Sequence, residues 1–122
     1  PVVLISAGIG ATPMIGMLDA LVAADSKRDV VVLHADRAEN TDALRAERNN
    51  AVSALANARQ QVWYEPDLMN LADTELPEGA QFYLCGGNGF LQAIRQQLAD
   101  RGIDRNNVHF ELFSPNDWLL DA

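Results

Sequence analysis

Five short apolar runs, with helix-like segments between most of them, constrain the fold of this chain most strongly. They are rich in β-branched residues and occupy Val2–Ser6, Val30–His34, Gln61–Tyr64, Phe82–Cys85 and Val108–Phe113. Strands that alternate with helices in this way form a parallel sheet covered by helices. We therefore predict an α/β fold, a three-layer αβα sandwich around a five-stranded parallel sheet.

Three helices are expected between these strands. The first should begin at Pro13 with Thr12 as its N-cap, because proline at the first helical position loses only an N–H that has no partner. The second spans about residues 42–57, and the third stops at Gly102. Residues 65–79 are predicted to form a loop with at most one helical turn. The apolar residues at helical spacing are Met14, Met17, Leu18 and Leu21; Leu44, Ala51, Val52 and Leu55; and Phe90, Leu91, Ile94 and Leu98.

Size and charge limit the domain organisation and the partners. The 122 residues suit one domain, and the formal net charge is −8, whereas nucleic acid and anionic membranes bind basic surfaces. No apolar run approaches the roughly 20 residues of a membrane helix. The single cysteine, Cys85, excludes the four thiolates of an iron–sulfur cluster within this chain. We expect a soluble cytoplasmic protein without nucleic-acid or membrane partners, cut from a longer polypeptide because the chain opens inside an apolar run.

A glycine loop follows the first predicted strand. The sequence Ser6-Ala7-Gly8-Ile9-Gly10-Ala11-Thr12-Pro13 takes a strand through two glycines into a helix. The backbone N–H groups of such a turn, and the positive end of the helix, can bind a pyrophosphate. The Rossmann fingerprint would place its third glycine where Pro13 stands, which disfavours a plain Rossmann dehydrogenase. The alternative is a tight turn that binds nothing.

A second glycine-rich turn, at residues 84–90, also joins a predicted strand to a helix. The carboxyl ends of parallel strands lie at one edge of the sheet, so the two turns should frame a crevice where the strand order reverses. Cys85 would lie at its mouth, beside a nicotinamide ring. The alternative for Cys85 is a small buried hydrophobic residue that ends a core strand.

Three motifs run in order along nearly the whole chain: Gly8-x-Gly10-x-Thr12-Pro13-Met14, Tyr83-Leu84-Cys85-Gly86-Gly87 and His109-Phe110-Glu111-Leu112-Phe113-Ser114-Pro115. Together they resemble the C-terminal NAD domain of the ferredoxin–NADP reductase superfamily, and within it the flavohaemoglobins. The resemblance implies a sheet ordered 3-2-1-4-5 and an FAD-binding barrel upstream. In flavohaemoglobins it also implies a haem-binding globin domain before the barrel.

The resemblance also implies roles for the residues of the first two motifs. Gly8, Gly10 and Thr12 would contact the pyrophosphate, with Ile9 and Pro13 in the same cofactor-binding loop. Cys85 and Gly86, followed by Gly87, would border the nicotinamide where it meets the flavin.

The third motif is predicted to reach the flavin. By the resemblance, Phe113 would cover the isoalloxazine ring of FAD. His109, Glu111 and Phe113 share one strand face, so Glu111 could tune the region between flavin and haem. Cys85, Glu111 and Phe113 are thus the expected catalytic residues. The alternatives are an apolar residue that closes the sheet for Phe113 and an exposed carboxylate for Glu111.

The residues after the second strand should distinguish NADH from NADPH. A carboxylate there favours a free 2′-hydroxyl and an arginine favours a 2′-phosphate, and this chain has Asp36 beside Arg37. Each could also be a solvated loop charge. The acid and the negative net charge lead us to predict a preference for NADH. His34 lies within a strand, so we expect a core histidine bonded to a neighbour, and we predict no metal site.

These observations predict a module that binds NAD(P)H and orients the nicotinamide for hydride transfer to FAD in another domain. Such a module would not turn over alone. In a full-length flavohaemoglobin, electrons would continue to haem for the dioxygenation of nitric oxide. One alternative is the reductase component of an oxygenase or another electron-transfer protein of the superfamily. A second is a non-catalytic flavodoxin-like domain that binds another phosphate ligand or none.

Overall fold

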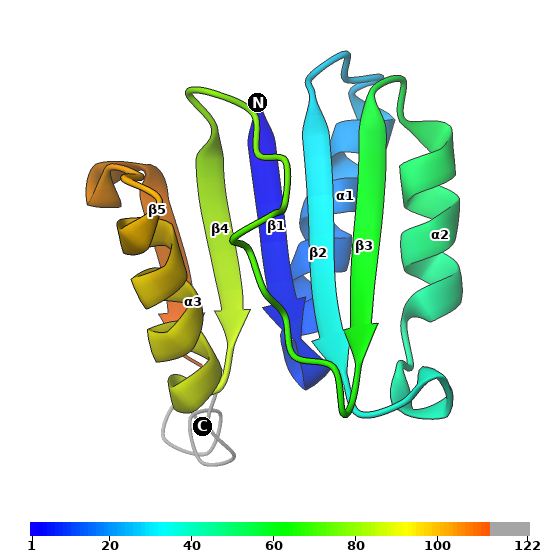
Figure 1. Ribbon diagram of the computed structural model, residues 1–122. Coiled ribbons are helices and arrows are strands. Elements are labelled where there is room, and N and C mark those ends of the chain that lie inside the picture. Colours follow the sequence, from blue (N-terminus) through cyan, green and yellow to red (C-terminus); the bar gives the residue numbers. More distant parts are fainter. Residues whose placement is uncertain (113–122) are drawn as a thin grey trace, which may run out of the picture.

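A parallel sheet forms the centre of the computed structural model, which describes the backbone of residues 1–112 and the side chains of residues 1–110. Within these residues the sheet has five strands in the order β3-β2-β1-β4-β5 (Figure 1). They are β1 (Val2–Ala7), β2 (Val30–Asp36), β3 (Ala58–Tyr64), β4 (Gln81–Gly86) and β5 (Val108–Leu112). All neighbouring strands pair in parallel. The predicted fold class and strand order are confirmed.

Helices cover both faces of this sheet. Helices α1 (Ala11–Ala23) and α2 (Arg45–Ala54) pack on one face, and α3 (Asn88–Asp100) packs on the other. The segment between β3 and β4 crosses the α3 face (Figure 1). Short 3-10 turns η1 (Gly8–Gly10), η2 (Glu39–Thr41) and η3 (Arg105–Asn107) complete the described elements. No helix within residues 1–112 has the length and apolar character needed to span a bilayer.

Successive side chains of each strand point to opposite layers. In β1, Val3 and Ile5 pack toward α3, whereas Val2 and Leu4 pack toward α1 and α2. All four are at most 4% exposed. Such continuous apolar strands are typical of parallel sheets that are buried on both faces. This alternation assigns every side chain near the carboxyl edge of the sheet to one of the two faces.

The first helix begins earlier than predicted. Residue Gly10 is its N-cap, the helix starts at Ala11, and Thr12 makes no capping hydrogen bond. The prediction of Thr12 as the N-cap is therefore wrong. The reason is that Gly10, the last residue of the 3-10 turn η1, already has a right-handed helical backbone conformation.

The second and third helices also differ in their bounds. Helix α2 is shorter than the predicted 42–57, because residues 42–44 form a turn and Leu55 is extended. Helix α3 begins at Asn88 and ends at Asp100, and Gly102 follows with φ +76°, as expected of a residue that stops a helix. Residues 65–79 contain turns and bends and no helical turn.

Candidate functional site

Two glycine turns meet at the carboxyl edge of the sheet, between β1 and β4, where the strand order reverses. The turn η1 leads from β1 into α1, and Gly87 leads from β4 into α3. Gly8 has φ +53°, a left-handed conformation that glycine adopts without strain. Gly10 packs against β4 so closely that a Cβ atom would overlap the carbonyl oxygen of Cys85 and lie 2.6 Å from the carbonyl carbon. The structure thus brings the two turns together as predicted.

Both helices that begin at this edge are suited to an anion. Among the described residues, no side chain caps α1 or α3, and neither helix has an acid in its first turn. This is notable in a chain with 17 aspartate and glutamate residues. Uncapped N–H groups and the positive end of the helix dipole attract negative charge. The edge therefore fits a phosphate group.

A cleft of about 430 Å³ opens beside η1 on the α3 face of the sheet. We call it the α3-side cleft. It lies between the ends of β1 and β2, the loop after β3, and α3. Its lining includes Gly8, Asp36, Arg37, Leu68 and Phe90, and Leu68 is 79% exposed. An apolar wall with a few charged groups at its rim is typical of a small-molecule site.

A second cavity of about 430 Å³ lies on the opposite face, between α1, β4 and β5. Pro13, Tyr83, Cys85 and His109 contribute to its lining, and the rings of Tyr83 and His109 stack with centroids 4.9 Å apart. The Cys85 side chain is 1% exposed and belongs to the core cluster around α1. Its side chain therefore matches the alternative of a buried residue that ends a core strand, and a contact with nicotinamide stays a prediction.

The other predicted residues of the two turns differ in their exposure. Ile9 is 72% exposed, and Thr12 and Gly87 are exposed as well. Gly86 is buried, and a Cβ atom there would lie 2.7 Å from the ring of Phe90. The turns therefore present both side chains and backbone toward solvent at this edge.

The catalytic residues predicted on the last strand are only partly described. The backbone of Glu111 pairs with Cys85 in the β4–β5 register, which brings it to the same edge. Phe113 lies outside the described residues. The roles of both residues stay predictions.

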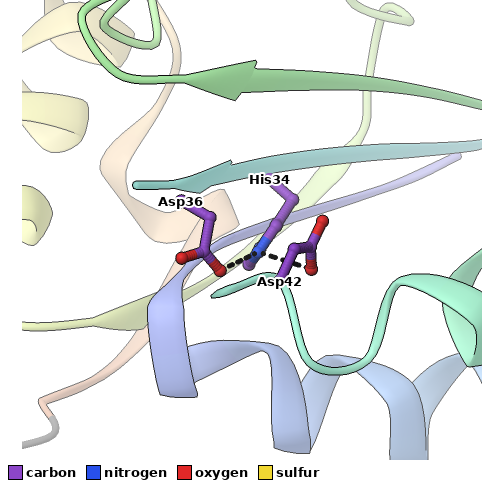
Figure 2. Close-up of side chains that lie close together, drawn as sticks. All are labelled: His34, Asp36 and Asp42. Carbon is purple, nitrogen blue, oxygen red and sulfur yellow. Dashed lines mark hydrogen bonds and ion pairs between the residues drawn. The ribbon is translucent and has the colours of Figure 1, made fainter. Parts of the chain in front are cut away.

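A histidine is buried at the end of β2 (Figure 2). His34 is 1% exposed, and its Nδ1 atom lies 2.8 Å from Oγ of Ser6. Its Nε2 atom lies 3.1 Å from Oδ2 of Asp36 and 3.3 Å from Oδ1 of Asp42. Because Nε2 faces two carboxylate oxygens, it carries the proton and donates. The prediction of a core histidine bonded to neighbours is confirmed.

Asp42 continues this network through a buried ion pair with Arg48. The guanidinium donates two hydrogen bonds to the carboxylate, at 2.9 and 2.7 Å, and the Tyr64 hydroxyl donates a third at 2.8 Å. Burial disfavours ionisation of Asp42, but the hydrogen bonds from Arg48 and Tyr64 and the charge of Arg48 outweigh it and lower the pKa. Burial likewise opposes the charge of Arg48, but Asp42 raises its pKa. Both partners therefore stay charged inside the protein.

The sequence interpretation missed this ion pair. A signal was present, because Arg48 lies three residues before Ala51 and seven before Leu55. It therefore falls on the apolar stripe of α2, where a long cation requires a partner.

His34, Asp36 and Asp42 could be taken for a metal site, because their ligand-type atoms lie within 4.8 Å of one another. However, Arg48 engages both carboxylate oxygens of Asp42, and its positive charge opposes a second cation beside it. We assign the group as a hydrogen-bond network. The expectation that the chain binds no metal stays a prediction.

Comparison with known proteins identifies the domain. Residues 4–75 match the family model of the oxidoreductase NAD-binding domain. The chain belongs to this family. It is 39% identical to the flavohemoprotein of Vibrio cholerae over 98% of its length, and 35% identical to that of Bordetella pertussis over 93%. The alignments cover 32% of each relative, so the chain spans about a third of their length.

Solved structures agree with this assignment. The flavohemoglobin of Malassezia yamatoensis, with bound FAD and heme, superposes with a TM-score of 0.89 at 28% identity, over 93% of this chain and 32% of the other. The FAD/NAD-binding domain of nitric oxide dioxygenase from Vibrio cholerae gives 0.88 at 38% identity, over 94% and 52%. Ferredoxin-NADP⁺ reductase from Plasmodium falciparum shares the fold, with a TM-score of 0.73 at 16% identity, over 92% and 52%. This NAD-binding domain therefore has the fold of ferredoxin reductase-like domains.

Proposed function

We propose that this chain binds NAD(P)H and orients its nicotinamide for hydride transfer to FAD held by another domain. The observation that carries the proposal is the pair of uncapped helix N-termini, α1 and α3, which meet where the strand order reverses. A dinucleotide has an anionic pyrophosphate at its centre, and such helix ends bind phosphates through backbone N–H groups. The α3-side cleft provides room beside them.

The chain contributes binding and orientation in this proposal. The first turn of α1, with the exposed hydroxyl of Thr12, would hold the pyrophosphate. The Gly86–Gly87 turn would support the nicotinamide end. The bound dinucleotide supplies the hydride, so no side chain of the chain is required as a general acid or base.

We further propose that the whole protein is a flavohaemoglobin that uses NAD(P)H, FAD and haem in nitric oxide dioxygenation. Flavohemoproteins 35–39% identical to the chain support this assignment. The chain would be the NAD(P)-binding part, and an FAD-binding domain and a globin domain of the same polypeptide would be its partners. We place the protein in the cytoplasm.

A carboxylate placed in the first turn of α1 tests dinucleotide binding. We expect Thr12→Glu to weaken binding of NAD⁺ and NADP⁺ at least about tenfold, because it repels the pyrophosphate. The same acid should leave stability unchanged or raise it by about 0.3–1 kcal/mol, since acids stabilise helix N-termini. Calorimetric titration and thermal unfolding measure the two effects. Gly10→Val would be a poorer test, because its side chain would collide with the backbone of Cys85.

Thr12→Gln is the matched control, with similar size and no charge. It should bind both nucleotides nearly as the wild type does. Equal affinity of Thr12→Glu and the wild type would contradict the proposed site, and so would failure of both nucleotides to bind the protein as the organism makes it.

The electron acceptor is tested by anaerobic addition of NADH to the protein as the organism makes it. Reduction of a haem after the flavin supports a flavohaemoglobin, whereas a flavin without haem supports the reductase component of an oxygenase.

A further inference from the structure

Asp36, the residue that we predict to meet the ribose, borders the α3-side cleft, but its carboxylate is bound to His34 and Thr41. Strand β2 extends to Asp36, so the alternation of the strand continues through this residue. Leu33 packs on the α3 face, whereas Val32 packs toward α1 and α2. His34 and Asp36 share the face of Val32, and Figure 2 shows the two side chains meeting there. The Asp36 side chain is 9% exposed.

Three hydrogen bonds hold the Asp36 carboxylate in this position. Nε2 of His34 donates to Oδ2 at 3.1 Å, the Thr41 hydroxyl donates to Oδ1 at 3.0 Å, and the backbone N–H of Arg37 donates to Oδ1 at 2.9 Å. A carboxylate offers about four acceptor positions, so three of them are used within the fold. About one acceptor position of the Asp36 carboxylate therefore remains for a ligand.

Further hydrogen bonds of Thr41 and Asp36 fix the turn that carries Arg37. The Thr41 hydroxyl is also 2.9 Å from the carbonyl oxygen of Ala38, and the Ala38 N–H donates to the Thr41 oxygen at 3.1 Å. The carbonyl of Asp36 accepts a hydrogen bond from the N–H of Glu65, at 3.2 Å. The turn after β2 is thus tied both to itself and to the loop after β3.

Arg37 is the cationic residue that this turn presents to the α3-side cleft. It is exposed and lines the cleft. Within the described part of the chain, no acidic side chain forms an ion pair with it. The acids that line the cleft from the neighbouring loop are Glu65 and Asp67. Because the Asp36 carboxylate is engaged within the fold, the charged side chains of the lining that remain for a ligand are Arg37, Glu65 and Asp67.

We propose that Asp36 is a positioning residue, which His34 and Thr41 hold so that Arg37 faces the cleft and reads the 2′ position of the adenosine ribose. This inference rests on the proposed function, because it assigns a role within the same dinucleotide site. Arg37 attracts a 2′-phosphate, and Glu65 and Asp67 oppose it. The selectivity between NAD and NADP is set by these three side chains rather than by Asp36.

The test compares the ratio of NAD⁺ to NADP⁺ affinity among variants of the protein as the organism makes it. Asp36→Asn removes the charge and keeps an oxygen that can accept from Arg37 and Thr41. We expect it to change the ratio less than about threefold. Arg37→Gln should weaken NADP⁺ about tenfold, the value of one charge-assisted hydrogen bond, and leave NAD⁺ nearly unchanged. Arg37→Lys keeps the charge and should restore part of the loss.

Thr41 provides the variant for the positioning role, because it is exposed and its replacement leaves the core intact. Thr41→Val removes the hydroxyl at nearly constant shape and should weaken NADP⁺ relative to NAD⁺ about threefold. Thr41→Ser keeps the hydroxyl and should match the wild type. A general loss of stability would weaken both nucleotides alike, so the ratio reports the position of Arg37.

The outcomes separate this inference from the proposed function. The inference is overturned if both nucleotides bind, Asp36→Asn raises NADP⁺ affinity tenfold or more relative to NAD⁺, and Arg37→Gln leaves the ratio unchanged. Asp36 would then read the ribose directly. An unchanged ratio in Thr41→Val would overturn the positioning role. If neither nucleotide binds the wild type, the proposed function fails and the inference fails with it.

Discussion

At the carboxyl ends of β1 and β2, the sheet is completed differently on its two faces. On the α1/α2 face, four polar residues are each at most 5% exposed and are joined by hydrogen bonds and ion-pair contacts: Ser6, His34, Asp42 and Arg48. On the α3 face, the same edge opens into a cleft. Among the described side chains, no buried nitrogen or oxygen lacks a partner. The comparison teaches that the closed face fixes the geometry of the edge, which leaves the other face free to receive a ligand.

Among the substitutions that test this comparison, loss of Asp42 should have the largest effect on the free energy of unfolding. We expect Asp42→Ala to lower the free energy of unfolding by about 3–5 kcal/mol, because it leaves the buried Arg48 without its partner. Domains of this kind are stable by about 5–15 kcal/mol, so the expected loss is a large part of the total stability. Urea titration at neutral pH measures the difference. A cost below about 1 kcal/mol would show that the closed face does not hold the fold together.

The cost of Asp42→Ala should depend on pH. The pKa of Asp42 in the folded protein is below its ordinary value. Its contribution to stability is therefore complete above the unfolded pKa of about 3.9 and is lost as the pH falls through the lower folded pKa. The difference between the wild type and Asp42→Ala should thus be largest near neutral pH and shrink in acid. A difference that grew in acid would contradict the assigned ion pair.

Gly10 packs against the second glycine turn, and its substitution should have the second largest effect on the free energy of unfolding. Gly10→Ala should cost about 1–3 kcal/mol, because its Cβ atom meets the Cys85 backbone, which must shift. Gly16 is the matched control, since it lies exposed within α1 and a Cβ atom there meets nothing within 4 Å. Gly16→Ala should stabilise the protein by about 0.5–1 kcal/mol. Equal effects in thermal unfolding would show that the close packing at Gly10 is unimportant.

A substitution in the α3-side cleft should have the smallest effect on stability. Ala93 lines the cleft on an exposed position of α3. Ala93→Leu should change the free energy of unfolding by less than about 0.5 kcal/mol. It should weaken NAD⁺ binding several-fold, because the longer side chain occupies the cleft. If it destabilised the protein as Asp42→Ala is expected to, the two faces would not differ in the way described.

The sequence was sufficient for the architecture because the strands and glycine turns depend on local signals. Apolar β-branched runs predict the strands of a parallel sheet, and Gly8 and Gly10 mark the turn that follows the first one. The end of the second strand is harder to predict from the sequence. Strand β2 was predicted to stop at His34, but it continues to Asp36. Because the strand includes Ala35 and Asp36, its alternation continues and directs the Asp36 side chain to the α1/α2 face.

The buried network could not be predicted as a whole because several of its contacts join residues that are distant in the sequence. Tyr64 meets Asp42 across 22 residues, and Ser6 meets His34 across 28. Such contacts depend on the order of strands and on the register between them, which places Ser6 opposite His34. A pattern within one element carries no information about its neighbour. Only the position of Arg48 on an apolar helix face pointed to a missing partner.

The close approach of Gly10 to Cys85 also has an evolutionary consequence. The atoms that exclude a side chain at position 10 belong to the backbone of Cys85, and every residue type has those atoms. No exchange of the side chain at position 85 could therefore compensate for a larger residue at position 10. A larger residue at position 10 would require the backbone of both turns to shift, so we expect glycine to be retained there whichever residue occupies position 85.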